Sequence, residues 1–262
     1  MPLVAAGKAG TVRVAAAGDI HCNQRERARV EAAFASLDGE ADLVLLAGDL
    51  TSHGDPLEAG VLGDICRGIE IPVFAVLGNH DWHEDRAADV VAVLEDAGVR
   101  MVEGRSATCE VRGLRVGIAG AKGFVGGFPD ASLPDFGEPS LRRVYAETTA
   151  EVEALDRALG EIDGCDMRIA LLHYAPTTST LGSEPQGIWA FLGSDRLARP
   201  ILAHRPDLVL HGHAHAGVFE GFVGPVPVYN VALPVTGRDF WIFELGGDRP
   251  LARLDAAEPP AV

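Results

Sequence analysis

The 262-residue sequence is poor in cysteine and in basic side chains. Its four cysteines are scattered and form no C-x-x-C pair, which argues against a disulfide framework and against a zinc site built from thiolates. The sequence contains 22 Lys and Arg residues but 38 Asp and Glu residues, so the formal net charge is −16. An acidic chain of this kind is a poor match for the phosphate backbone of a long nucleic acid, and we expect no such partner.

Long apolar runs are missing as well. No stretch approaches the roughly 20 consecutive apolar residues of a membrane span, and residues 1–10 lack the pattern of a secretion signal. We therefore expect no membrane insertion and a cytoplasmic location. With 47% hydrophobic and 23% charged residues, the composition is that of an ordinary globular protein. The sequence leaves the oligomeric state open.

Short apolar runs alternate with helical patterns in the first part of the chain. The runs at 12–17, 43–47 and 73–77 are rich in Val, Leu and Ala, and each is followed by a glycine. Between them, apolar residues recur at the spacing of one helix face. This alternation predicts β-α-β units around a parallel sheet.

The second half of the chain has a different pattern. Runs at 107–111 and 114–119 flank an Arg-Gly pair and predict a hairpin, and a long helical stripe follows at 141–162. A further helix is expected to be interrupted at Pro200. Other strand-like runs, the last three of them expected to be antiparallel, lie at 168–172, 208–210, 217–221, 226–231 and 240–245.

Two long connections interrupt these patterns, at 122–139 and 174–194. The first is rich in Gly, Pro and Phe and looks too broken for a regular element. Loops of this length are usually functional or disordered. No repeat and no linker divides the chain, so we expect a single domain over 1–262 with tails at 1–10 and 256–262.

Oxygen and imidazole side chains follow five of the predicted strands. In chain order they are Asp19, His21, Asp49, Asn79, His80, Asp81, His173, His211, His213 and His215. Taken singly, Asp19 and Asp49 could cap helices, and His173 could be a core histidine. Because the carboxyl ends of parallel strands open on one crevice, we instead expect these side chains to converge.

The residue types indicate the chemistry. Carboxylate, amide and imidazole groups without thiolates suit divalent ions such as Mn, Fe, Zn, Co or Ni. The candidates outnumber what one ion would take from the protein, so two ions sharing a carboxylate is the simplest interpretation. Two such ions about 3.5–4 Å apart can deprotonate water and bind the attacking and leaving oxygens of a displacement at phosphorus.

The motifs Asp-x-His, Gly-Asp, Gly-Asn-His-Asp, His and Gly-His-x-His occur in this order between residues 19 and 215. Each is common alone, but the ordered set resembles the calcineurin-like metallophosphoesterase family, and most closely its small bacterial phosphodiesterase-type members. The resemblance implies an α/β fold, a four-layer α/β/β/α sandwich with a parallel β-α-β first half and a more antiparallel second half.

The resemblance also implies roles for the motif residues. One ion would be held by Asp19, His21, Asp49 and His215, and the other by Asp49, Asn79, His173 and His213. A hydroxide bridging the ions would attack phosphorus in line, and His80 would assist the leaving oxygen, with Asp81 orienting its imidazole. That last pairing also makes physical sense, since a neighbouring carboxylate keeps a histidine protonated and oriented near neutral pH.

The choice of substrate would depend on the two long loops. We expect their aromatic residues to form an apolar or base-stacking wall, and Lys122 or the Arg142-Arg143 pair to meet a phosphate oxygen. Tyr174 and His211 are further candidates for substrate contact. Packing of these residues on their own scaffold stays open.

The predicted function is hydrolysis of a small phosphodiester, of nucleotide type or similar, with two divalent metal ions as cofactors. A phosphomonoesterase or a pyrophosphate hydrolase with the same centre is the alternative. A catalytically inactive binding scaffold is the least favoured, because every motif position is intact.

Overall fold

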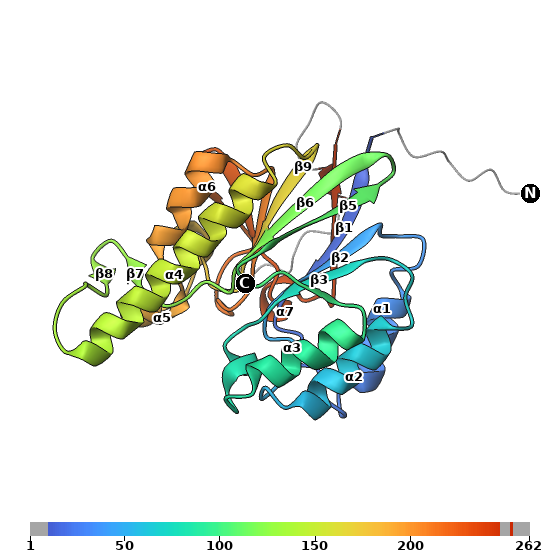
Figure 1. Ribbon diagram of the computed structural model, residues 1–262, viewed down its shortest axis with the longest axis horizontal. Coiled ribbons are helices and arrows are strands. Elements are labelled where there is room, and N and C mark those ends of the chain that lie inside the picture. The colour runs from blue at the N-terminus through green and yellow to red at the C-terminus, as the bar shows by residue number, and fades with distance from the viewer. Residues whose placement is uncertain (1–9, 247–251, 254–262) are drawn as a thin grey trace, which may run out of the picture.

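The computed structural model describes residues 10–246 and 252–253, and it places two six-stranded sheets between helices (Figure 1). Apart from Gly10, the predicted tails at 1–10 and 256–262 lie outside the described residues. Of the helices in the described ranges, none has the length and the apolar character needed to cross a membrane.

The first sheet has the strand order β14-β13-β1-β2-β3-β4. Its parallel strands are β1 (Val12–Ala17), β2 (Leu43–Ala47), β3 (Val73–Val76) and β4 (Arg100–Met101). Two antiparallel strands from the far end of the chain complete it, β13 (Trp241–Leu245) and β14 (Ala252–Arg253). The three N-terminal strands are confirmed, since runs of Val, Leu and Ala suit strands covered on both faces.

The second sheet has the order β11-β12-β10-β9-β6-β5. Its strands are β5 (Ser106–Val111), β6 (Leu114–Gly120), β9 (Met167–Leu171), β10 (Leu208–His211), β11 (Glu220–Val223) and β12 (Val226–Asn230). The four central strands are parallel, and only β5 and β11, at the edges, are antiparallel to their neighbours. Crossovers through α4 (Pro139–Glu161) and α6 (Ala198–His204) explain the parallel pairs β6–β9 and β9–β10, because each returns the chain in the same direction.

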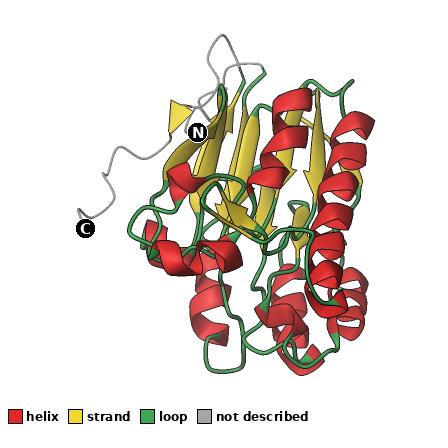
Figure 2. Cartoon of the chain, turned by 90° about the vertical axis from the view of Figure 1, so that its left-hand side faces the viewer, coloured by secondary structure: helices red, strands yellow, loops and turns green. Residues whose placement is uncertain are grey.

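Helices cover the outer face of each sheet, as Figures 1 and 2 show. The first sheet is covered by α1 (Arg27–Ala35), α2 (Pro56–Cys66) and α3 (Ala87–Asp96), and the second by α4 and α6. Strand alternation divides the core accordingly: Val44 and Leu46 pack toward the helices, whereas Leu43 and Leu45 pack toward the other sheet. The predicted α/β/β/α layers are therefore confirmed.

Some local predictions are corrected. Residues 122–139 contain a short antiparallel pair, β7 (Gly127–Phe128) and β8 (Ala131–Ser132), and α5 (Trp189–Leu192) contacts both strands. Pro200 lies in the first turn of α6, where its missing N–H costs no helical hydrogen bond, so it does not interrupt a helix. The strand expected at 217–221 begins only at Glu220, and α7 (Leu233–Thr236) follows β12.

Candidate metal centre

Side chains from both sheets meet at the carboxyl ends of β1, β2, β3, β9 and β10. Backbone hydrogen bonds join the first two loops, since Asp19 N donates to Gly48 O at 3.0 Å and His21 N donates to Asp49 O at 3.0 Å. His213 connects the second sheet to the first, because its backbone N–H donates to Asp19 Oδ2 at 3.0 Å. The predicted convergence of the strand ends is therefore present in the structure.

Four of the converging residues have a left-handed backbone. The φ angle is 58° at Asp19, 47° at His21, 50° at Asp49 and 68° at His213. A residue other than glycine that adopts this conformation costs about 1 kcal/mol or more of stability, and such residues gather at functional sites. The loop hydrogen bonds hold these turns, so the backbone fixes the direction in which each of the four side chains leaves the chain.

Two glycines make room for the carboxylates. A Cβ atom on Gly78 would lie 2.1 Å from Asp49 Oδ1, and one on Gly212 would lie 2.3 Å from Asp19 Oδ2. Both separations are far below van der Waals contact. The glycine next to each motif is thus required by the close approach of a carboxylate from another loop.

Asn79, His173 and His213 form what we call the buried half-site. His173 is fully buried, and its Nδ1 lies 2.9 Å from Ala47 O. Because a carbonyl can only accept, Nδ1 carries the proton and Nε2 presents a lone pair. The Nε2 atom lies 3.0 Å from Asn79 Oδ1 and 3.4 Å from Asp49 Oδ1. Three electron-pair donors so close together suit a cation between them.

His213 completes this half-site in the same manner. Its Nε2 donates to Phe191 O at 3.0 Å, which leaves Nδ1 as the atom able to bind a metal. Asp49, His173 and His213 each offer a ligand atom within 4.8 Å of the others. Burial lowers the pKa of His173 and lowers that of His213 to about 4, so both rings are neutral at pH 7.

Asp19, His21 and His215 form the open half-site. Their ligand atoms also lie within 4.8 Å of one another. His215 Nε2 lies 2.8 Å from Asp19 Oδ1, and the side chains of His215 and His21 are 46% and 29% exposed. Among the described residues, no backbone carbonyl fixes either imidazole.

Asp49 lies between the half-sites. Its Oδ1 is 3.4 Å from His173 Nε2, and its Oδ2 is 3.8 Å from His21 Nε2. Burial and the nearby charge of Asp19 raise the pKa of Asp49. Burial acts in the same direction on Asp19, but the hydrogen bond from His215 and the neighbouring imidazoles outweigh it and lower the pKa. A divalent ion on each side of Asp49 would favour both charged carboxylates, so the side chains fit a metal centre.

The prediction that Asp81 orients His80 is wrong. His80 Nδ1 instead lies 2.9 Å from Ser52 O, and Nε2 faces Asp49 Oδ2 at 3.9 Å. The Asp81 carboxylate is fully buried. It accepts hydrogen bonds from the backbone N–H groups of Leu50, Thr51 and Gly78. Asp81 therefore ties the loop after β2 to the loop after β3, and acts on His80 only through the backbone.

His211 belongs to the scaffold of the centre rather than to its surface. It is fully buried, and its two ring nitrogens lie 2.8 Å from Gly212 O and 2.8 Å from Thr180 Oγ1. Both nitrogens are thus already engaged. The spacing of two residues along a strand suggested that His211 would face the same side as His213, but β10 ends at His211 and the chain then turns.

Lys122 and Tyr174 lie beside the buried half-site, and their contact with substrate stays a prediction. Both are almost completely buried. Lys122 Nζ donates to Gly123 O at 2.9 Å and lies 3.8 Å from Glu151 Oε1. The Tyr174 ring packs against that of His213, with 4.5 Å between centroids. Arg142, by contrast, is exposed and pairs with Asp135.

Sequence reasoning did not single out two residues close to His80 in the chain or in space, Ser52 and Trp82. Ser52 acts through its carbonyl, and the identity of a side chain carries no signal for that role. Trp82 follows His80 in a one-turn helix, is 47% exposed, and has its ring 6.0 Å from Lys122 Nζ. Its position directly after the Gly-Asn-His-Asp motif was the available signal.

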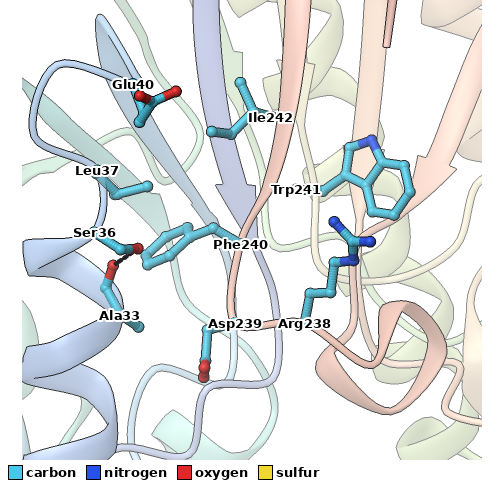
Figure 3. A pocket seen from close by; sticks show the side chains of 9 residues that line it. All are labelled: Ala33, Ser36, Leu37, Glu40, Arg238, Asp239, Phe240, Trp241 and Ile242. Atoms are coloured by element: carbon cyan, nitrogen blue, oxygen red, sulfur yellow. Dashed lines mark hydrogen bonds between the residues drawn. The ribbon is translucent and has the colours of Figure 1, made fainter. Parts of the chain in front are cut away.

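A separate groove lies between the end of α1 and the start of β13 (Figure 3). Ser36, Glu40, Arg238 and Trp241 are among its lining residues, and none of the lining residues is a histidine. This groove therefore lacks the combination of imidazoles and carboxylates found at the carboxyl ends of the strands. We place the candidate site at those strand ends and not in the groove.

Comparison with known proteins gives one family and one fold. The model for calcineurin-like phosphoesterases matches residues 12–217. Among curated proteins, none is a significant match. Among solved structures, phosphopantetheinyl hydrolase (PptH) from Mycobacterium tuberculosis is 16% identical with a TM-score of 0.61, over 84% of this chain and 88% of that one.

Two further structures are similar. TT1561 from Thermus thermophilus is 21% identical with a TM-score of 0.55, over 90% of this chain and 94% of that chain. A putative 5′-nucleotidase from Staphylococcus aureus is 14% identical with a TM-score of 0.57, over 93% of this chain and 52% of the other. At these identities the likeness establishes the fold, and substrates do not follow from it.

Proposed function

This chain belongs to the calcineurin-like phosphoesterase family, and from that premise we propose that it is a metal-dependent hydrolase of small phosphodiesters. One observation carries the proposal: Asp49 belongs to two groups of candidate ligand atoms, one with His173 and His213 and the other with His21 and His80. The His80 Nε2 atom lies 3.9 Å from Asp49 Oδ2. Two divalent ions bound there would activate water and neutralise charge on the phosphoryl oxygens. Mn, Fe, Zn, Co and Ni all suit these ligands.

In this proposal each half-site holds one ion and Asp49 contributes to both. The buried half-site supplies an amide oxygen and two imidazoles, and the open half-site supplies a carboxylate and two imidazoles. Tyr174 packs against His213 of the buried half-site, and the Lys122 ammonium lies 5.4 Å from the Tyr174 ring, so both are candidates for contact with a bound substrate.

His80 is the proposed general acid. Its Nδ1–H is held by Ser52 O, so the proton that can be transferred is the one on Nε2, the atom facing Asp49. When the bond from phosphorus to the leaving oxygen breaks, that oxygen keeps the electron pair and takes the Nε2 proton. The rings of His21 and His83, with centroids 4.5 Å and 4.2 Å away, restrict the orientation of the His80 imidazole.

Charge supports a diester over a monoester. A phosphodiester carries one negative charge, whereas a phosphomonoester carries nearly two at neutral pH. The chain has a formal net charge of −16, and its field therefore opposes the approach of the monoester more strongly. Inside the centre the bound cations would reverse this field at short range.

The test compares bis(4-nitrophenyl) phosphate with 4-nitrophenyl phosphate in the presence of each candidate metal. We expect metal-dependent hydrolysis of both and a kcat/KM at least about tenfold higher for the diester. A higher value for the monoester would establish the monoesterase alternative. No turnover of either ester by folded, metal-loaded protein would contradict hydrolase activity and favour a binding scaffold.

A further inference from the structure

The two long connections of the chain pack against each other as one unit. The strands β7 and β8 come from the first connection and α5 comes from the second (Figure 1). Gly126 N donates to Ala190 O at 2.9 Å, and Gly127 N donates to Gly193 O at 2.8 Å, so backbone hydrogen bonds join β7 to α5. We call β7, β8 and α5 together the loop unit.

The loop unit has an apolar core that reaches into the candidate centre. Phe128 of β7 and Leu192 of α5 belong to the same buried cluster as Ala214. Ala214 is fully buried and lies between His213 and His215 in the sequence. Its two chain neighbours are candidate ligands of the buried and the open half-site respectively. The core of the loop unit thus packs on the segment that supplies one imidazole to each half-site.

A hydrogen bond joins the loop unit directly to the buried half-site. His213 Nε2 donates to Phe191 O at 3.0 Å, and Phe191 lies in α5. A helix of four residues is not stable by itself, so packing and the hydrogen bonds from β7 must keep this carbonyl in place. Phe128 contributes to that packing, because its fully buried ring lies 6.3 Å from the ring of Trp189, the first residue of α5.

We propose that Phe128 is a positioning residue for the buried half-site. It packs against α5, keeps the Phe191 carbonyl on His213 Nε2 and so leaves Nδ1 as the atom available to a metal ion. If α5 shifts, the imidazole loses its acceptor, and its orientation must be restricted again when an ion binds. Loss of such a supporting hydrogen bond commonly weakens metal binding about 10–100-fold. The inference rests on the proposed function and assigns the two connections a role besides contact with substrate.

The experiment titrates metal-free protein with Co²⁺, following calorimetry and the visible absorption of the bound ion. We assign the tighter binding step to the buried half-site. Phe128→Ala should weaken this step about tenfold and change the weaker step by no more than about twofold. Trp189→Ala, which removes the partner ring on α5, should have the same effect, whereas Phe128→Leu should restore most of the affinity.

Two controls separate positioning from a general loss of stability. Phe34→Ala removes an equally buried ring from the core beneath α1, and it should leave both binding steps unchanged. In a His213→Ala background, Phe128→Ala should cause no further loss of Co²⁺ affinity, because the imidazole that it positions is already absent. A structural defect elsewhere would add to the loss in that background.

An unchanged tighter step in both Phe128→Ala and Trp189→Ala would overturn the inference. So would an equal loss in Phe34→Ala, or a loss that adds to that of His213→Ala. The titration contains no phosphoester, so these outcomes are separate from turnover of the nitrophenyl esters. Turnover combined with unaffected Co²⁺ binding refutes only the role of Phe128, and the expected binding pattern without turnover refutes only the hydrolase.

Discussion

The two half-sites differ in how firmly the chain holds them. In the buried half-site, His173 and His213 are each fixed by a backbone carbonyl and present one lone pair inward. In the open half-site, His215 is 46% exposed and bonds to Asp19, which is another candidate ligand. An ion in the buried half-site thus finds its imidazoles already in place, whereas one in the open half-site must first separate His215 from Asp19. We expect the first ion to be held more tightly and the second to exchange more readily.

The largest effect is expected from removing what the half-sites share. Asp49→Asn keeps the size of the side chain but removes its charge and one of its two oxygens, so it can no longer serve both ions. Turnover of bis(4-nitrophenyl) phosphate should fall about a thousandfold or more, and elemental analysis should show loss of metal. Asp38→Asn, at an exposed carboxylate, is the control. Turnover like that of the unmodified protein would rule out Asp49 as the shared ligand.

A second variant should leave the ligands of both half-sites intact while removing the proposed general acid, His80. His80→Ala should lower turnover by about 10²–10⁴-fold with unchanged metal content, because general acid catalysis contributes an effect of that size. The loss should be larger for an alkyl leaving group than for nitrophenolate, which needs less protonation. His53→Ala, at an exposed histidine outside the centre, should be neutral. Loss of metal from the His80 variant would make His80 a ligand instead.

The difference between the half-sites is tested by a pair of variants. We expect His173→Ala to weaken metal binding about tenfold more than His215→Ala does, since only the first removes a fixed, fully buried ligand. Metal titrations should also show that excess metal restores the activity of the His215 variant more completely. Equal losses of affinity in the two variants would contradict the proposed difference.

The smallest expected effect is on the free energy of unfolding of the protein, and it comes from the buried carboxyl group of Glu103. Glu103 Oε2 accepts a hydrogen bond from Leu77 N at 2.9 Å, while its buried Oε1 has no partner within the described chain. Burial and the nearby Glu151 raise the pKa of Glu103 to about 7 from its usual 4.5. The folded protein therefore binds this proton more tightly than the unfolded chain, and stability is lost as pH rises through 7.

The loss from Glu103 approaches about 3 kcal/mol between pH 5 and pH 8. Glu103→Gln cannot ionise, so its free energy of unfolding should match that of the original protein at pH 5 and exceed it at pH 8. Urea unfolding of metal-free protein at the two pH values measures this directly. A variant with the same pH dependence as the original protein would show that Glu103 is ionised without cost.

The sequence predicted where the ligands meet because the rule behind that prediction is simple. Parallel strands of one sheet bring their carboxyl ends together, so Asp19, Asp49 and Asn79, which follow neighbouring strands of the first sheet, could be placed without knowing any loop. The role of Asp81 could not be obtained in this way. Adjacency in sequence suggested a contact with His80, but its carboxylate turns inward to the backbone of the neighbouring loop.

Other features of the centre depend on the course of the chain after a strand ends. His211 and His213 are two residues apart, yet one is engaged within the scaffold and the other faces Asp49, since the backbone becomes left-handed at His213. Ser52 contributes a carbonyl, which every residue type has. Trp82 reaches Lys122 across the junction of the two sheets, and no local pattern specifies such a long-range contact.

The pairing of β1 with β13 has a consequence for how the protein is made. Val12 pairs with Leu245, so a strand in the middle of the first sheet must wait for one of the last strands of the chain. Contacts this distant in sequence form slowly, and synthesis delivers the N-terminal part first. Until then, the apolar faces that belong between the sheets have no cover. A growing chain of this protein would therefore depend on protection from aggregation until β13 has been synthesised.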